Sequence, residues 1–140
     1  MVEIEGTISN RSLSILIDPW DTLSYITPKI MENFHLSKVR HSKPCLVQLD
    51  TGEKIKVTFF TVNCQFKIQD HQSRINLNVL PLGSYDMIIG LDFLEKYKVV
   101  LNCFDKTFTY VVEDQIVRKI EGIRKHVSLR QISAMQLRSV

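Results

Sequence analysis

Apolar and polar residues alternate with a period of two along several stretches of the chain, as half-buried β-strands require. The first two stretches run from Val2 to Ile8 and from Leu13 to Ile17. Between them, Ser9-Asn10-Arg11-Ser12 consists of residues that favour tight turns. These positions predict a β-hairpin at the start of the chain.

The same period returns on both sides of Asp50-Thr51-Gly52, over residues 45–49 and 55–59. Asp, Thr and Gly favour a tight turn, so we expect a second hairpin here. A further strand pair is predicted over residues 62–68 and 75–80, because both segments alternate and polar residues separate them.

Three shorter apolar segments complete the predicted strands. Met87-Ile88-Ile89-Gly90 is apolar throughout, which is typical of a strand buried on both faces. The other two segments are Val99–Leu101 and Phe108–Val112, with a turn between them.

Two short helices interrupt these strands. Thr27 followed by Pro28 is typical of a helix N-cap with proline at the first helical position, which predicts a helix over Pro28–His35. A second brief helix is expected over Asp92–Tyr97, capped by Asp92. The expected fold class is therefore mainly β with one or two short helices.

The character of the sequence changes after Val112. Ile116, Ile120, Ile123 and Val127 recur at helical spacing among several Lys and Arg residues. We expect one domain over residues 1–112, followed over 113–140 by a basic, weakly amphipathic tail or linker towards a following domain. The alternative is that the tail forms a helix that binds nucleic acid or a protein partner.

Composition narrows the possible functions. The 140 residues suffice for one domain, with 44% apolar and 24% charged residues, which is typical of a globular protein. The net charge of +3 does not indicate nucleic-acid binding by the folded domain. No apolar run is long enough to span a membrane, and the first residues are acidic where a secretory signal would be basic. We expect no membrane partner and a cytoplasmic location.

The metal-binding residue types are scattered. Cys45, Cys64 and Cys103 form no Cys-x-x-Cys pair, so buried thiols in a reducing compartment are expected. The four histidines occur singly, without the spacing of a zinc site. The sequence predicts neither a metal site nor a cofactor.

One carboxylate stands out. Asp18 ends the apolar strand segment Leu16-Ile17, and Pro19-Trp20 follows it directly. A charge at the end of a buried strand is costly unless it is paired or used. Taken alone, such an aspartate is more often a turn former than a functional group.

A second segment changes that balance. Leu80 to Leu94 contains a Leu-Pro-Leu-Gly stretch, then Ile88-Ile89-Gly90, then a helix with Asp92 and an aromatic residue. Together with Leu16-Ile17-Asp18 and the later Tyr25-Ile26, it resembles the retropepsin-like aspartic proteases, specifically the protease domain in the polyprotein of gypsy-type long-terminal-repeat retrotransposons. The resemblance covers roughly residues 2–112.

The resemblance implies a closed β-barrel of the acid protease fold and an aspartic endopeptidase that cleaves polypeptides. The catalytic residue implied is Asp18. Each chain supplies one such carboxylate, so the active unit implied is a homodimer. The hairpin tip Asp50-Thr51-Gly52 corresponds to the flap that closes over the substrate. Ile88, Ile89 and Gly90 form the buried strand beside the site.

Asp50-Thr51-Gly52 is also the triplet that a motif search for this family would select as catalytic. The alternating residues after it favour an exposed hairpin arm, so we interpret it as a flap turn. Asp21-Thr22-Leu23 is a weaker rival, because Pro19 and Trp20 precede it where the family has aliphatic residues.

The chain departs from the family pattern at two positions. Pro19 replaces Ser or Thr and lacks both the hydroxyl and the backbone N–H that bond across the two-fold axis in the family. Trp20 replaces Gly, and its indole would occupy space near the substrate backbone. Three hypotheses therefore remain open: a working endopeptidase, a catalytically inactive retropepsin-like domain kept as a fold or for partner binding, and a small β-barrel interaction module of other ancestry.

Overall fold

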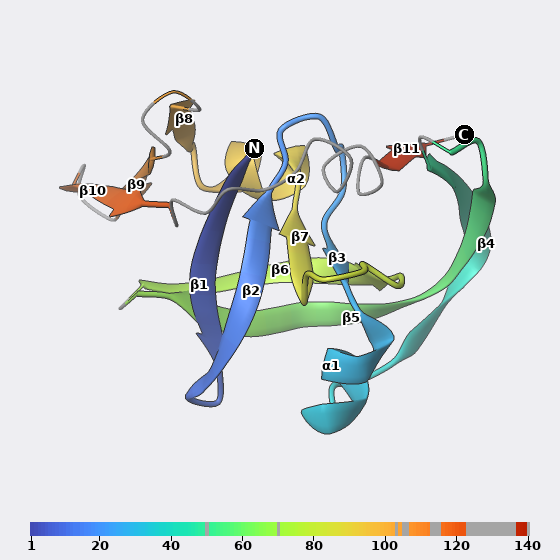
Figure 1. The fold of residues 1–140 in the computed structure, drawn as a ribbon. Coiled ribbons are helices and arrows are strands. Elements are labelled where there is room, and N and C mark those ends of the chain that lie inside the picture. The colour runs from blue at the N-terminus through green and yellow to red at the C-terminus, as the bar shows by residue number, and fades with distance from the viewer. Residues whose placement is uncertain are drawn as a thin grey trace.

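The structure is a computed structural model, and it describes residues 1–49, 51–69, 71–102, 104, 107–112, 116–122 and 137–139. Most of these residues lie in strands, as Figure 1 shows. The two helices are short: α1 (Pro28–Asn33) and α2 (Leu91–Lys96). The strands are β1 (Val2–Ile8), β2 (Arg11–Ile17), β3 (Tyr25–Ile26), β4 (Val39–Leu49), β5 (Lys54–Ile68), β6 (His71–Val79), β7 (Met87–Ile89), β8 (Val100–Asn102), β9 (Thr107–Val112), β10 (Ile116–Glu121) and β11 (Leu137–Ser139).

The larger of two sheets has eight strands in the order β1-β2-β7-β3-β6-β5-β4-β11. Strand β1 also pairs with β5, through Gly6 opposite Ile68 and Thr7 opposite Lys67, so part of the sheet closes into a ring. A ring of strands leaves few unpaired edges. The mainly β fold with short helices agrees with the sequence-based prediction.

The hairpin of β1 and β2 forms where the alternation predicts it, with Val2 opposite Ile17 and Ile8 opposite Arg11. Its two turn residues, Ser9 and Asn10, have φ values of 50° and 65°. Two successive positive φ values characterise the tight turn that suits the right-handed twist of paired strands.

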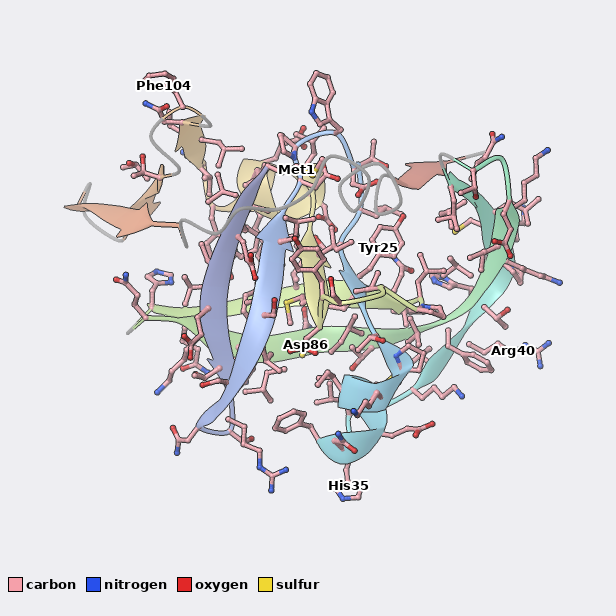
Figure 2. The ribbon with its side chains drawn as sticks, in the orientation of Figure 1. Met1, Tyr25, His35, Arg40, Asp86 and Phe104 are labelled. Atoms are coloured by element: carbon pink, nitrogen blue, oxygen red, sulfur yellow. The ribbon has the colours of Figure 1, made fainter. Side chains whose placement is uncertain are left out.

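Strand β7 lies at the centre of the sheet, between β2 and β3. It runs parallel to β2, with Ile17 opposite Ile89, although the two strands are far apart in the sequence. Asp86 holds the start of this pairing, because its carboxylate accepts a hydrogen bond from the backbone N–H of Ser14 (2.9 Å) and its own N–H donates to the Ser14 carbonyl (3.0 Å). Figure 2 labels Asp86 at this end of β7.

The core inside the ring is built from the inward residues of the alternating strands. Strands β1, β2, β5, β6 and β7 contribute alternate side chains, and α2 covers one end with Phe93, whose ring lies 5.8 Å from that of Phe66. Aromatic pairs at such distances add to the stability that burial of their surface provides. Other members of this core cluster include Val2, Ile4, Leu13, Ile15, Ile17, Ile26, Ile68, Leu77, Met87 and Ile89.

Some predicted boundaries were wrong. The two strands expected over 55–59 and 62–68 are one strand, β5, which passes an irregularity between Thr61 and Cys64. The predicted helix after Thr27 is confirmed as α1, but the Thr27 hydroxyl makes no capping bond. Two-residue strand β3 was not predicted at all, because it is too short to show a period.

The helical spacing of Ile116 and Ile120 is not realised as a helix. Residues 116–121 form β10, which pairs with β9 in a three-stranded sheet of order β10-β9-β8. Residues 113–115 and 123–136, which hold most of the predicted tail, lie outside the described residues, as do Asp50 and Cys103. None of the helices in the described ranges is long and apolar enough to cross a membrane.

Candidate functional site

Asp18 lies where the sequence predicts it, at the end of the buried strand β2. Its backbone N–H donates to the carbonyl of Ile89 on β7 (2.9 Å), which continues the pairing of the two strands by one residue. Its side chain has no exposed surface. One carboxylate oxygen, Oδ1, accepts a hydrogen bond from the backbone N–H of Trp20 (3.0 Å). The structure therefore brings Asp18 beside the Ile88-Ile89-Gly90 strand.

The loop after Asp18 is held from the far side by the start of α2. The carbonyl of Asp21 accepts from the N–H of Leu91 (2.8 Å), and that of Thr22 accepts from the N–H of Asp92 (3.1 Å). These bonds use two of the N–H groups that the first turn of a helix leaves without an internal partner. The same contacts close the helix end and fix the loop.

Gly90 is required at this junction by its close contacts. A Cβ atom at Gly90 would meet the carbonyl oxygens of Leu23 and of Asp21, the latter at 2.7 Å. The φ of Gly90 is −107°, which any residue can adopt, so the requirement is for space rather than for conformational freedom. Its N–H also donates to the Ser24 hydroxyl oxygen (2.9 Å).

The carboxylate of Asp92 also binds this loop. We call the contacts of Gly90, Leu91 and Asp92 with the loop the clamp. It accepts hydrogen bonds from the backbone N–H of Ser24 (3.1 Å), from the Ser24 hydroxyl (2.5 Å) and from the N–H of Phe93 (2.8 Å). Burial raises the pKa of Asp92, and these hydrogen bonds to the carboxylate only partly oppose that shift. The predicted role of Asp92 as the N-cap is wrong, because Gly90 occupies the cap and Asp92 binds the Asp18 loop instead.

A second aspartate is buried in the same loop. Asp21 is 2% exposed. Nearby, the pKa of the Tyr25 hydroxyl is raised, mainly by burial and then by the negative charge of Asp21. Sequence reasoning considered Asp21 only as a rival catalytic residue, and it did not single out Ser24. The sequence carried no local signal for the bonds between Ser24 and Asp92, which lie 68 positions apart.

Pro19 and Trp20 form the outer part of the loop. Pro19 is half-buried, whereas Trp20 is 76% exposed. In the single chain the indole therefore faces solvent rather than filling a space beside Asp18. An exposed tryptophan is unusual, because burial of its large apolar ring is favourable. The exposed ring offers this area for contact with another molecule.

The predicted flap turn lies at the tip of the β4–β5 hairpin. Gly52 donates its N–H to the Leu49 carbonyl (2.8 Å), and its φ of +89° favours glycine. Thr51 and Gly52 are exposed, unlike the buried end of β2, and Asp50 lies outside the described residues. The residues that follow form the start of β5, the hairpin arm that the alternation predicts.

A second apolar cluster lies between the hairpin and the strands around Asp18. We call it the hairpin cluster. Figure 2 shows Tyr25 on the side of β3 that faces the curved β4–β5 hairpin. Burial raises the pKa of the Tyr85 hydroxyl, and the charge of Glu3 adds to the shift. The members of the hairpin cluster are Leu16, Tyr25, Val47, Val57, Leu80, Leu82, Tyr85 and Ile88.

This arrangement has a defined chemical capacity. A dry carboxylate at a strand end, held on a rigid loop, can accept or share a proton once a second acidic group comes near. The described part of the chain contains no group of three or more His, Cys, Asp and Glu residues placed to hold a metal ion.

Comparisons with known proteins bear on the family and the fold. The family model of the retroviral aspartyl protease matches residues 2–116. Among solved structures, the chain is similar to the retroviral protease-like domain of Ddi1 from Leishmania major, with a TM-score of 0.60 and 14% identity over 86% of this chain and 94% of that chain. At this identity the likeness supports the fold alone. No curated protein matches the chain. Because the family model spans most of its length, the chain belongs to the retroviral aspartyl protease family.

Proposed function

We propose that the chain is the aspartic endopeptidase domain of a gypsy-type retrotransposon polyprotein, located in the cytoplasm, with a further domain after it. By family organisation that next domain would be a reverse transcriptase. The observation that carries the proposal is the position of Asp18, fully buried at the end of β2 and bonded to the Ile89 carbonyl. The clamp formed by Gly90 and Asp92 supports it, because a catalytic carboxylate must be held in one geometry.

In this proposal the active unit is a homodimer, because one chain supplies one Asp18. Two carboxylates that meet around one water molecule cannot both ionise, so one keeps a proton while the other is charged. The charged carboxylate takes a proton from the water, which attacks the peptide carbonyl carbon. The protonated carboxyl gives its proton to the carbonyl oxygen. No metal or cofactor takes part.

The β4–β5 hairpin serves as the flap over the polypeptide substrate, with Asp50, Thr51 and Gly52 at its tip. Gly52 at φ +89° and the exposure of Thr51 suit a turn that moves. The hairpin cluster beneath it packs the hairpin against the strands around Asp18. Water exclusion by a closing flap strengthens the interactions of the charged groups inside.

A second candidate function is an inactive domain that retains the fold. Pro19 and the exposed Trp20 are the observations that favour it. Pro19 has no N–H or hydroxyl to bond across the two-fold axis, and each such bond lost in a buried site costs about 1–3 kcal/mol if its partner stays unsatisfied. The dimer would then be weak, and the two Asp18 carboxylates would seldom meet.

The deciding experiment incubates the purified chain with a mixed peptide library at mildly acidic pH. We expect cleavage, and we expect Asp18→Asn to lower its rate by about 10²-fold or more, because the substitution removes the base. Asp50→Asn is the matched control, since it changes the rival triplet and should leave most of the activity. Cleavage that persists in Asp18→Asn contradicts the site. A complete absence of cleavage in the parent chain supports the inactive domain.

A further inference from the structure

The outer edge of the hairpin strand β4 pairs with a strand from the C-terminal end of the chain, which the sequence did not predict. On one side β4 pairs with β5, and on the other it pairs with β11 near the C-terminus of the chain. The second pairing is antiparallel, with Leu137 opposite Leu49, Arg138 opposite Gln48 and Ser139 opposite Val47. Figure 1 shows β11 beside the upper end of β4, close to the hairpin tip. The last strand of the chain therefore adds to the hairpin that covers the hairpin cluster.

The backbone bonds across this edge follow from those on the other side. The N–H of Leu49 donates to the Glu53 carbonyl (2.8 Å), so Leu49 directs its backbone groups towards the β5 side. Successive residues of a strand direct their N–H and C=O groups to alternate sides. The N–H and C=O of Gln48 therefore face β11. Arg138 lies opposite Gln48, so its C=O and N–H face those of Gln48 as a hydrogen-bonded pair.

The rest of the outer edge of β4 is poorly suited to pairing. The ladder with β5 is irregular between Arg40 and Cys45, and Lys43 and Pro44 lie in that stretch. Irregular pairing, exposed lysine and proline are all features that keep an edge from pairing with another strand. The segment from Val47 to Leu49 has none of them, so the outward backbone groups of Gln48 can pair with an extended strand, as they do with β11.

The position of this edge gives it a functional meaning. The side chain of Val47 is 1% exposed and packs in the hairpin cluster with Tyr25 and Ile88. Ile88 directly precedes Ile89, whose carbonyl accepts the N–H of Asp18. A peptide paired with Val47–Leu49 would thus lie along the border of the candidate active site. Addition of a strand to an open sheet edge is a common way to bind extended peptides, because the backbone supplies affinity.

We propose that the chain's own C-terminal strand β11 blocks the outer edge of β4 at Val47–Leu49, the docking edge, against extended polypeptide from solution. Because β11 is tethered, its local concentration is high, and it competes with polypeptide that approaches from solution. The competition with substrate rests on the proposed protease function. The docking edge itself does not.

The test uses two proline variants of the full chain and amide hydrogen exchange. Arg138→Pro removes the N–H that faces Gln48, so exchange at the Gln48 amide should accelerate about tenfold. Leu137→Pro is the matched control, because its N–H faces away from β4, and it should change that rate by less than about twofold. The Val57 amide in the buried part of β5 should keep its rate in both variants, which shows that the fold is intact. Equal Gln48 rates in the two variants overturn the proposal.

A second readout measures docking in solution. A fluorescent peptide with the sequence of residues 134–140 should bind the Arg138→Pro chain at least about tenfold more tightly than the parent chain, since the edge is then open. The same peptide with proline at the position of Arg138 should not bind. If exchange accelerates but neither chain binds the peptide, the docking edge is refuted. Neither readout requires cleavage, so failure of the protease function and failure of this inference are distinguishable.

Discussion

At the scale of single residues, the Asp18 loop requires a residue without a side chain at position 90. Gly90 lies against the carbonyls of Leu23 and Asp21, where a methyl group does not fit. We expect Gly90→Ala to lower the free energy of unfolding by about 1–3 kcal/mol, because the loop must move away from α2. Urea unfolding followed by far-ultraviolet circular dichroism measures the loss.

The control for this prediction is Thr22→Ala. Thr22 is exposed in the same loop, and its backbone bond to Asp92 remains in the variant, so the change should stay within about 0.5 kcal/mol. Similar losses in Gly90→Ala and Thr22→Ala would show that the space around Gly90 does not matter.

The raised pKa of Asp92 makes the stability of the fold depend on pH. Its pKa is raised in the folded chain, mainly by burial, so folding favours the protonated form. This contribution is fully present below the pKa of the unfolded chain and is lost as the pH rises through the folded pKa. Relative to Asp92→Asn, which does not titrate, the parent chain should therefore lose stability as the pH rises above 3.8, the ordinary pKa of an aspartate.

Urea midpoints at several pH values measure this difference. Asp86→Asn is a suitable control, because Asp86 also accepts a backbone N–H bond, from Ser14, but lies outside the clamp. A stability difference between the parent chain and Asp92→Asn that is constant with pH would contradict the assignment. It would mean that Asp92 carries the same charge in the folded and unfolded chains.

The residue scale also shows the limits of the sequence. Asp18 could be singled out because it ends an apolar strand segment with a charge. The Ile88-Ile89-Gly90 run could be singled out because its segment is apolar throughout. The bonds from Asp92 to Ser24 could not, because they join positions 68 residues apart and have no local signature. For the same reason Asp92 was mistaken for a helix cap, the commonest local role of such a residue.

At the scale of elements, hairpins were predictable and short central strands were not. Alternation and turn residues predicted the β1–β2 hairpin in both arms. Strand β3 has two residues and exists only because β6 and β7 pair with it on both sides. Tertiary pairing therefore decides its conformation, and no local pattern records it.

The β1–β2 turn offers a stabilising change. Ser9 and Asn10 both have positive φ, a conformation in which the pair Asn-Gly is preferred. The double substitution Ser9→Asn with Asn10→Gly should raise the free energy of unfolding by about 0.5–1 kcal/mol, measured in urea.

The matched control places glycine just outside that turn. Ser12→Gly changes an exposed position within β2 and should destabilise the chain by about 0.5–1 kcal/mol, because glycine is unfavourable inside a strand. If both changes destabilise, the turn does not have the backbone conformation described here.

At the scale of the whole molecule, the question is whether two chains meet at the Asp18 loop. Pro19→Ser with Trp20→Gly restores the residue types of the resembling family. If Pro19 weakens the contact across the axis, this variant should dimerise at least about tenfold more tightly than the parent chain in sedimentation equilibrium.

The result has a clear alternative. If the exposed indole of Trp20 itself anchors a second chain, the variant should instead be more monomeric, since it loses a large apolar contact. Trp20→Ala alone separates the two cases, because it removes the indole and leaves Pro19 in place. A parent chain that stays monomeric at high micromolar concentration favours the inactive domain.

The parallel pairing of β2 with β7 affects how the protein is made. Ser14 and Asp86, which bond across this pairing, are 72 positions apart. At about 5–20 residues per second, a ribosome needs roughly 4 to 14 s to add the second strand after the first. During that interval the nascent chain carries Asp18 without the partner strand that buries it. The chain therefore acquires this site late in its synthesis, after most of residues 2–112 have been added.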